Sequence, residues 1–373
     1  MTAPEFRSRL LFVSVIVSDD QGKGHVFPYA EAVGEACRQN GWGHLALVPE
    51  TVTPDRLRLG WRRVLPGAAD HSRWRTLCDF RRAFRAQLVE LCQRADGLVL
   101  FVDPTTVTTL AALWSVVGEF RENLRVCLMF RYDSSTTRGE LPAYGWLNRA
   151  FARKLGSARV VTVTDSEPLR EFLGDTFCRQ MHVLPIPHTF SALAEKKPGM
   201  PIVCWWPGKP IENKGRAILQ RLACTAAPHS TDFIFRGARS AAWEQVPGGP
   251  RVELLPDRLA GSDYADQMTQ ADVILLPYAP AVYRRRTSGI FVEAVVAGKI
   301  PVVSAGTWAA SELLRHGLPE LAWDDWAPET TFVRLRSLWA DGDLRSRLAA
   351  LRRQYAREHS ISGYAAALSQ LFR

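Results

Sequence analysis

TSGIFVEAVVAGKIPVVS, residues 287–304, joins a short helix to a buried strand, and this stretch decides the fold. Thr287 or Ser288 can cap the helix, and Gly289 leaves the first N–H groups of the helix open to phosphate oxygens. Gly298 is the residue type that most often ends a helix, and the apolar run after it predicts a buried strand. A helix with an open amino terminus followed by a buried strand is typical of a parallel α/β sheet.

Glu293 lies inside this helix, on the same face as Val296 and Ala297. A carboxylate among small apolar residues is unfavourable unless a hydrogen-bond donor satisfies it. The two hydroxyls of a ribose would do so, and an internal ion pair is the structural alternative. Glu293 is therefore a candidate for holding a nucleotide.

Apolar runs that predict strands alternate with helical patterns along the chain. The predicted strands are 10–17, 45–48, 98–102, 125–130, 160–163, 202–206, 233–235, 252–255, 273–276 and 301–303, with helices at 29–40, from about 214, and at 364–372. This alternation indicates βαβ units and parallel sheets, so we expect an α/β fold.

A proline-rich segment at 183–201 interrupts the alternation and predicts a hinge between two Rossmann-like halves. We expect an N-terminal domain at 1–190, a second domain at 191–355, and a C-terminal helix at 356–373 that packs on the first domain. Two such domains facing a cleft would bind a ligand at the carboxyl ends of their strands.

Two loops carry further candidate residues. Gly22-Lys23-Gly24-His25 follows the first predicted strand, where glycines let the backbone approach a ligand and the next helix offers N–H groups to an anion. His25 is a candidate catalytic residue, and the preceding residues Gly22, Lys23 and Gly24 are candidates on the acceptor side. A plain βα turn with a structural histidine is the alternative.

The second loop, 207–215, follows the strand predicted at 202–206. Lys209 and Lys214 are two cations that can neutralise a diphosphate, and Gly208 gives phosphate groups access to the backbone. Solvated lysines on a surface loop are the alternative.

The formal net charge of +9 is concentrated in part between residues 56 and 85, where nine arginines stand against two aspartates. Leucine, tryptophan and phenylalanine residues are interleaved with them. This pattern fits either an anionic membrane surface or a solvated helix face whose apolar side lies in the core. No nucleic-acid-binding module accompanies the charge, so we expect no nucleic-acid partner.

No apolar run approaches the roughly 18–20 residues that spanning a bilayer requires. The seven cysteines are scattered and form no CxxC pair, which favours reduced thiols and a cytoplasmic protein.

The two motifs of the second half, in this order, resemble the donor domain of GT-B glycosyltransferases. They are most similar to the retaining family 4 type of bacterial polysaccharide biosynthesis. Segment 271–277 resembles the strand that leads into the second motif, and segments 162–166 and 183–187 resemble those before the hinge. The residues that match are Gly208, Lys214, Gly215, Glu293, Ala294, Gly298, Pro301, Val302 and Val303.

The chain departs from that family at three places. Lys209 replaces an arginine, and Arg285 stands where the family has a glutamate associated with the transferred sugar. The histidine of the first half is replaced by the segment 130–133, which makes Asp133 a candidate base and Arg131 a candidate acceptor-side cation.

The resemblance implies a hexosyltransferase with the GT-B architecture that needs no metal or other cofactor. Such an enzyme would move a sugar from a nucleotide-diphosphate donor to a saccharide or lipid-linked saccharide. The implied donor residues are Gly208, Lys209, Lys214, Arg285, Thr287, Ser288, Gly289 and Glu293. A lipid-linked acceptor would place the protein on the inner face of the plasma membrane. The alternatives are a sugar-nucleotide epimerase and an inactive binding or scaffold subunit on the same fold.

Overall fold

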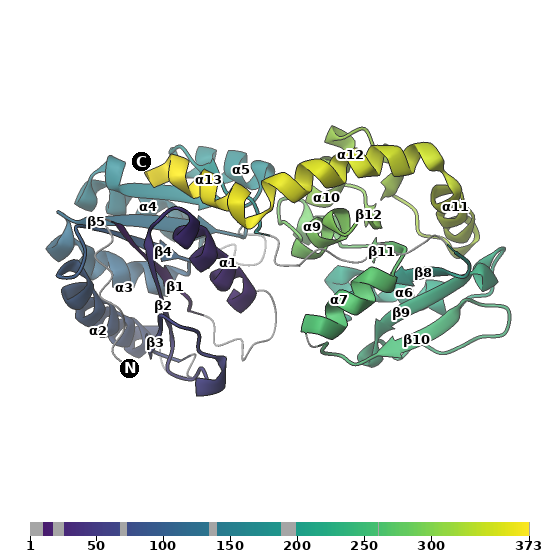
Figure 1. Cartoon of the computed structure of the whole chain (residues 1–373), viewed down its shortest axis with the longest axis horizontal. Coiled ribbons are helices and arrows are strands. Elements are labelled where there is room, and N and C mark those ends of the chain that lie inside the picture. The colour runs from purple at the N-terminus through teal and green to yellow at the C-terminus, as the bar shows by residue number, and fades with distance from the viewer. Residues whose placement is uncertain are drawn as a thin grey trace. The chain divides into compact units, whose positions relative to one another are not determined.

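The computed structural model describes residues 10–17, 26–67, 73–133, 140–187, 199–259 and 261–372. The chain divides into two compact units (Figure 1). Unit 1 comprises Met1–Thr189 with Ser360–Arg373, and unit 2 comprises Phe190–His359. Each unit carries its own parallel sheet, which confirms the predicted α/β fold. None of the helices in the described ranges combines the length and apolar character that crossing a bilayer requires.

The sheet of unit 1 has the strand order β3–β2–β1–β4–β5–β6–β7, and each neighbouring pair is parallel. The chain leaves the adjacent strands β1 and β4 in opposite directions, so the sheet is doubly wound. The strands are β1 (Leu10–Val15), β2 (Gly43–Pro49), β3 (Trp61–Leu65), β4 (Gly97–Val102), β5 (Leu124–Phe130), β6 (Val160–Thr164) and β7 (His182–Val183).

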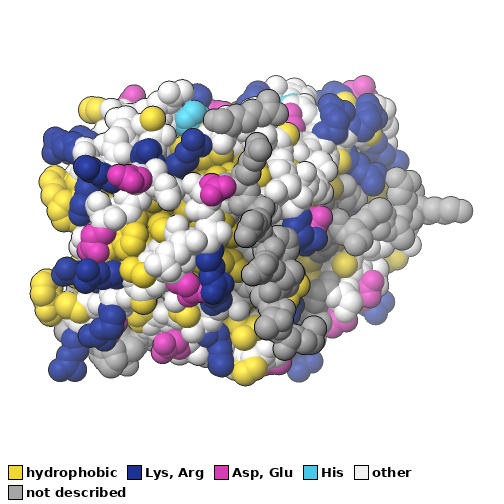
Figure 2. Space-filling model, turned by 60° about the vertical axis from the view of Figure 1, so that its left-hand side comes forward, with side chains coloured by type: hydrophobic (Ala, Val, Ile, Leu, Met, Phe, Trp, Pro, Cys, Tyr) yellow, Lys and Arg dark blue, Asp and Glu magenta, His cyan; other side chains and the backbone are white. Residues whose placement is uncertain are grey.

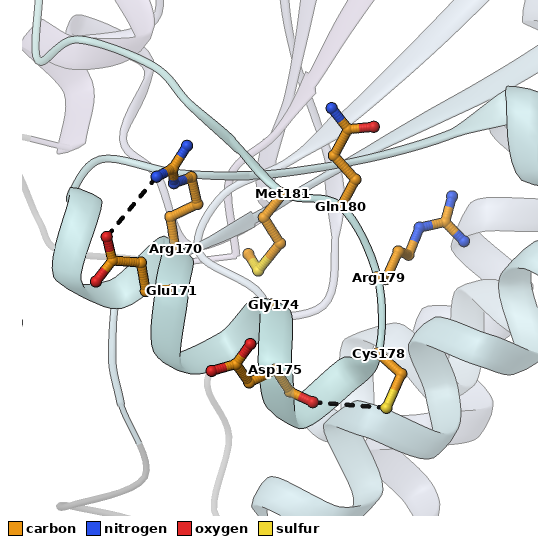
Figure 3. A pocket seen from close by; sticks show the side chains of 8 residues that line it. All are labelled: Arg170, Glu171, Gly174, Asp175, Cys178, Arg179, Gln180 and Met181. Atoms are coloured by element: carbon orange, nitrogen blue, oxygen red, sulfur yellow. Dashed lines mark hydrogen bonds and ion pairs between the residues drawn. The ribbon is translucent and has the colours of Figure 1, made fainter.

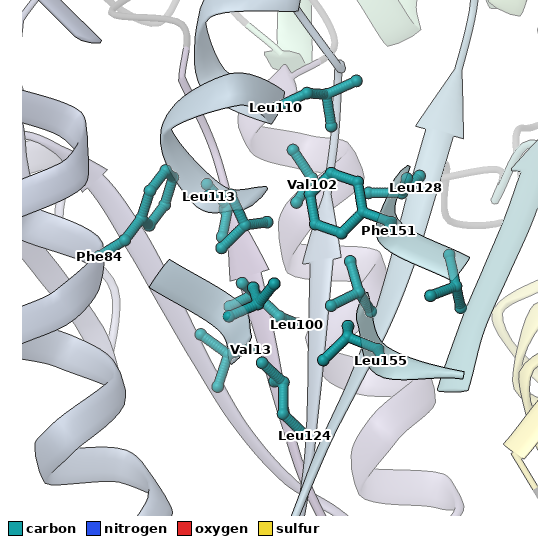
Figure 4. Close-up of a cluster of buried hydrophobic side chains, with 14 of the residues drawn as sticks. Val13, Phe84, Leu100, Val102, Leu110, Leu113, Leu124, Leu128, Phe151 and Leu155 are labelled. Carbon is teal, nitrogen blue, oxygen red and sulfur yellow. The ribbon is translucent and has the colours of Figure 1, made fainter. Parts of the chain in front are cut away.

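Helices cover both faces of this sheet. One face packs against α1 (Val26–Gln39) and α13 (Ile361–Phe372). The other face packs against α2 (Arg73–Cys92), α3 (Val107–Val117), α4 (Leu141–Leu155) and α5 (Glu167–Phe177). In the core between the sheet and α2–α5, Val13 and Leu100 on the strands lie among Phe84 and Phe151 from the helices (Figure 4). Each such side chain stabilises the fold by about 1.5–3 kcal/mol when it is fully buried. The core therefore holds the strands in place, and with them the sheet edge where the strands end.

The sheet of unit 2 repeats the same winding in the order β10–β9–β8–β11–β12–β13, again with parallel pairs. Its strands are β8 (Ile202–Trp205), β9 (Phe233–Ala238), β10 (Arg251–Leu255), β11 (Val273–Leu276), β12 (Ile300–Ser304) and β13 (Ala322–Trp323). Its helices are α6 (Arg216–Ala223), α7 (Gly261–Gln270), α8 (Pro280–Tyr283), α9 (Gly289–Val296), α10 (Trp308–Arg315), α11 (Pro328–Ala340) and α12 (Gly342–Glu358).

The basic segment 56–85 is not one helix, because it contains β3 and the first part of α2. Leu65, Phe80 and Phe84 are buried in the core, whereas Leu59 and Trp74 are 94% and 72% exposed. Within this segment, α2 therefore has a solvated basic face and an apolar side in the core, as one of the two alternatives expects. Two large apolar side chains, Leu59 and Trp74, remain at the surface. Basic and hydrophobic side chains are interspersed on the face of the molecule drawn in Figure 2.

The C-terminal helix α13 belongs to unit 1 and packs beside α1. The hydroxyl of Tyr364 lies 2.9 Å from the hydroxyl of Tyr29, and both tyrosines are buried. The side-chain amide of Asn40 donates to the carbonyl oxygen of Ala365 at 2.8 Å. The chain thus leaves unit 2 after α12 and completes the core of unit 1.

Candidate functional site

The two motifs of the second half meet where the winding of the unit 2 sheet reverses. Strands β8 and β11 are neighbours there, and the chain continues from β8 to β9 but from β11 to β12. Open α/β sheets bind ligands outside the carboxyl ends of such a strand pair. Segment 207–215 follows β8 and segment 277–288 follows β11, so the expected donor residues lie on these two segments and on the helix after them.

Gly215 fixes how the two segments touch. Its φ is +84°, and a Cβ atom on it would lie only 2.3 Å from the carbonyl oxygen of Pro277. The backbone N–H of Ala279 also donates to the carbonyl oxygen of Asn213 at 2.9 Å. Only glycine permits this approach, because it combines a left-handed backbone with the absence of a side chain.

Lys214 is a half-buried cation beside this contact. Its Nζ lies 5.8 Å from the ring centroid of Tyr278, and a Cβ atom on Gly208 would lie 3.4 Å from the same nitrogen. Burial, and then the charge of Arg286, lower the pKa of Lys214 below its ordinary value. Among the described residues, no carboxylate forms an ion pair with Lys214. The ammonium group is therefore placed for an anion that the described residues do not supply.

Segment 277–288 adds more positive charge to the same edge. Arg284, Arg285 and Arg286 are consecutive, and the guanidinium carbon of Arg286 lies 5.4 Å from the ring centroid of Tyr283. Lys209, on the opposite segment, is exposed. These cations favour a polyanionic ligand such as a diphosphate.

Helix α9 begins as its sequence predicts. The Ser288 hydroxyl accepts a hydrogen bond from the N–H of Phe291 at 3.3 Å, which makes Ser288 the N-cap, and Gly289 is the first helical residue. Thr287 precedes the cap and is half-buried. The helix ends before Gly298, whose φ is +69°. Because the N–H groups that precede Phe291 in the first turn have no acceptor within the helix, this end of α9 attracts negative charge.

Glu293 is 7% exposed, and its Oε2 accepts a hydrogen bond from the Tyr264 hydroxyl at 2.7 Å. Burial, and then the Glu293 carboxylate, raise the pKa of Tyr264 far above its ordinary value. Part of the hydrogen-bonding capacity of Glu293 is thus met within unit 2. The sequence did not indicate Tyr264, because nothing in α7 marks a partner for a residue 29 positions away.

In unit 1, Arg131 follows β5 and is held by two carboxylates at the ends of the neighbouring strands. Its Nε and Nη2 donate to both oxygens of Asp103 at 2.7 and 2.6 Å, and its Nη1 donates to Asp165 at 2.7 Å. Its guanidinium carbon lies 4.3 Å from the ring centroid of Tyr29. Burial alone would lower the pKa of Arg131, but Asp103, Tyr29 and Asp165 hold it above its ordinary value.

Sequence reasoning placed a cation at this position and missed both of its aspartates. The signal was available, because Asp103 and Asp165 each directly follow a buried strand, as Arg131 does. Asp133, two residues further on, is 8% exposed. Gly22, Lys23, Gly24 and His25 lie outside the described residues, between the end of β1 and the start of α1.

A surface pocket in unit 1 lies away from these strand ends. Figure 3 shows its lining, which comes from the last turns of α5 and the segment after it: Arg170, Glu171, Gly174, Asp175, Cys178, Arg179, Gln180 and Met181. Because α5 runs back from the carboxyl edge of the sheet, its end lies toward the edge where the strands begin. None of the candidate residues lines this pocket.

No protein-family model matches this chain, and no curated protein matches it. Several solved structures do match the chain. The chain is similar to a glycosyltransferase from Rickettsia africae ESF-5, with a TM-score of 0.65, 8% identity and coverage of 97% of both chains. It is also similar to an E. coli structure described as trehalose-6-phosphate bound with UDP-2-fluoro glucose, with a TM-score of 0.64 and 14% identity over 98% of this chain and 99% of the other.

A third similar structure is that of a putative UDP-N-acetylglucosamine 2-epimerase from Listeria monocytogenes, with a TM-score of 0.60 and 11% identity over 97% of this chain and 95% of that one. At these identities the likeness concerns the fold. The chain therefore has the two-sheet GT-B fold of the glycosyltransferases among these structures.

Proposed function

We propose that this protein is a glycosyltransferase that uses a nucleoside-diphosphate sugar as donor. The observation that carries the proposal is the position of Lys214. Its ammonium group lies at the reversal point of the unit 2 sheet, beside Gly208, with no ion pair to a described carboxylate. A cation held in this way is suited to the diphosphate of a leaving nucleotide.

The proposed donor site uses the two segments and α9. Lys209, Lys214 and Arg285 neutralise the diphosphate together with the N–H groups that follow Ser288. Stabilisation of charge on the leaving group is then electrostatic and needs no metal ion. Glu293 holds the ribose, and the hydrogen bond from Tyr264 fixes one of its oxygens.

The proposed acceptor side is in unit 1. Asp133 and His25 are the candidate catalytic bases, and Gly22, Lys23 and Gly24 are the candidate backbone contacts. Arg131 acts there by holding Asp103 and Asp165 at the strand ends. The proposed substrates are a hexose-type donor sugar and a saccharide or lipid-linked saccharide acceptor of cell-surface glycan assembly.

We also propose that the protein works in the cytoplasm and can contact the inner face of the plasma membrane. Exposed Leu59 and Trp74 near the arginines of segment 56–85 support this. Basic and aromatic side chains favour an anionic bilayer surface. Binding to anionic but not neutral vesicles at low salt is expected in flotation assays, and equal recovery with both would contradict the membrane contact.

Transfer is tested by incubating the full chain with UDP-, GDP- and dTDP-sugars, with and without a saccharide acceptor extract. A glycosyltransferase releases nucleoside diphosphate faster when the acceptor is present. The likeness to the Listeria protein makes an epimerase the second candidate, and conversion of the donor sugar without acceptor would support that activity instead. Binding of a nucleotide sugar with no turnover in either assay would indicate an inactive binding subunit.

A further inference from the structure

Tyr278 follows the end of β11 and lies beside Lys214 of the proposed diphosphate site. Its side chain is 3% exposed. The ring centroid lies 5.8 Å from the Nζ of Lys214 and 4.4 Å from the ring centroid of Tyr283. Arg286 in turn lies 5.4 Å from the Tyr283 ring. The two cations are thus connected through a pair of tyrosine rings that are tilted by 37° relative to each other.

The surroundings of Lys214 are otherwise unfavourable for a cation. Arg286 is close enough to lower its pKa, and Ile290 in the first turn of α9 approaches Gly208 from the same side as the ammonium group. The positive end of the helix therefore also faces this region. Without an ion pair among the described residues, another group must define where the ammonium sits.

An aromatic face has the property that this position requires. It attracts an ammonium group through the ring quadrupole but carries no charge of its own. A carboxylate at the same place would neutralise the lysine and compete with a phosphate ligand. A tyrosine ring fixes the cation and leaves its charge available.

We propose that Tyr278 is a positioning residue that holds the Lys214 ammonium group against its ring so that the full positive charge faces the donor diphosphate. This inference rests on the proposed donor site. Tyr278 lies outside both motifs of the second half, so its role is an addition to them.

The chain offers a matched pair of variants. The Tyr278 hydroxyl is buried and makes no hydrogen bond of ordinary geometry to a described residue, although the Ser288 side chain lies near it. Tyr278→Phe therefore keeps the ring and loses only this contact with Ser288. Tyr278→Leu removes the ring and keeps an apolar side chain.

Binding is measured by titration calorimetry of the full chain with UDP, GDP and dTDP, and the diphosphate that binds wild type most tightly is then used with both variants. We expect Tyr278→Phe to bind within about 2-fold of wild type and Tyr278→Leu to bind roughly 5- to 30-fold more weakly. Equal affinity of Tyr278→Leu and wild type would overturn the inference. If wild type binds none of the three diphosphates, both the inference and the proposed function are wrong.

The pH profile separates positioning from a packing defect. Arg286 and the Tyr278 ring, both on the neighbouring segment, act on Lys214, and Lys209 and Glu212 are the other ionisable residues of its own segment. Affinity falls as pH rises through the pKa of Lys214, because the neutral amine no longer attracts phosphate. Removal of the ring lowers that pKa further, so Tyr278→Leu loses affinity at a lower pH, whereas Tyr278→Phe follows wild type. A parallel profile for Tyr278→Leu, weaker by the same factor at every pH, would indicate packing alone and contradict the inference.

Discussion

Gly215 shows how a single missing side chain brings two functional segments together. Substitution to alanine puts a Cβ atom into the carbonyl group of Pro277 and forces a φ of +84° on a residue that disfavours it. The left-handed conformation alone costs about 1–2 kcal/mol in an L-residue. The clash adds to this, since backbone atoms of Pro277 must move. We therefore expect Gly215→Ala to lower both the free energy of unfolding and the affinity for nucleoside diphosphate.

Gly317 is the matched control for that substitution. Its φ is +69°, and a Cβ atom there meets nothing within 4 Å. Gly317→Ala should lower the free energy of unfolding only by the conformational cost, about 1–2 kcal/mol, and leave the nucleotide affinity unchanged. Denaturant unfolding and titration calorimetry check both variants. Equal losses for Gly215→Ala and Gly317→Ala would show that the contact with Pro277 is unimportant.

At the level of elements, two helices of unit 2 carry the same cap in different places. Ser288 caps α9 through the N–H of Phe291, and Thr307 caps α10 through the N–H of Ala310, both at 3.3 Å. Ser288→Ala should cost about 1 kcal/mol of stability, and Thr307→Ala at least as much, because the Thr307 hydroxyl also donates to the carbonyl oxygen of Ser304 at 2.7 Å. Only Ser288→Ala should also weaken nucleotide binding, because only α9 begins at the proposed donor site. Weaker binding in both variants, or in neither, would contradict this assignment.

The elements also show what sequence pattern can and cannot predict. The central strands are continuous apolar runs, because both of their faces are covered by helices, and these runs were predicted. Strand β3 was missed because it lies at the sheet edge and its arginine-rich sequence, WRRVL, is only partly buried. Strands β7 and β13 have two residues each, too few to form a pattern.

The site was predictable to the extent that it is local in sequence. The cap of α9, its end before Gly298 and the cations of segment 207–215 follow from neighbouring residues. Contacts between different elements could not be predicted from neighbouring residues. The Tyr264–Glu293 hydrogen bond and the tyrosine beside Lys214 depend on how β11, α7 and α9 pack, which no spacing in the chain encodes.

On the scale of the whole molecule, each unit has its own sheet and core, yet unit 1 is completed by the last helix of the chain. Tyr364 on that helix is fully buried against Tyr29. Tyr364→Ala should therefore destabilise unit 1 by about 3–5 kcal/mol, as removal of other large aromatic side chains from cores does. Tyr364→Phe is the control, since it keeps the ring.

Scanning calorimetry with and without nucleotide checks that expectation. The unit 1 transition should move to lower temperature in Tyr364→Ala, whereas a bound nucleoside diphosphate should raise the unit 2 transition in wild type and variant alike. Loss of the nucleotide effect in Tyr364→Ala would show that the donor site depends on unit 1.

The central claim is that Lys214 holds the diphosphate of a nucleotide donor, and titration calorimetry with UDP, GDP and dTDP on wild type, Lys214→Met and Lys214→Arg tests it most directly. Met keeps the length of the side chain without its charge, and no described carboxylate is left unpaired by the change. We predict that at least one diphosphate binds wild type, that Lys214→Met weakens it roughly 10- to 100-fold, and that Lys214→Arg retains most of the affinity. Binding unchanged in Lys214→Met, or no binding of any of the three to wild type, would contradict the account.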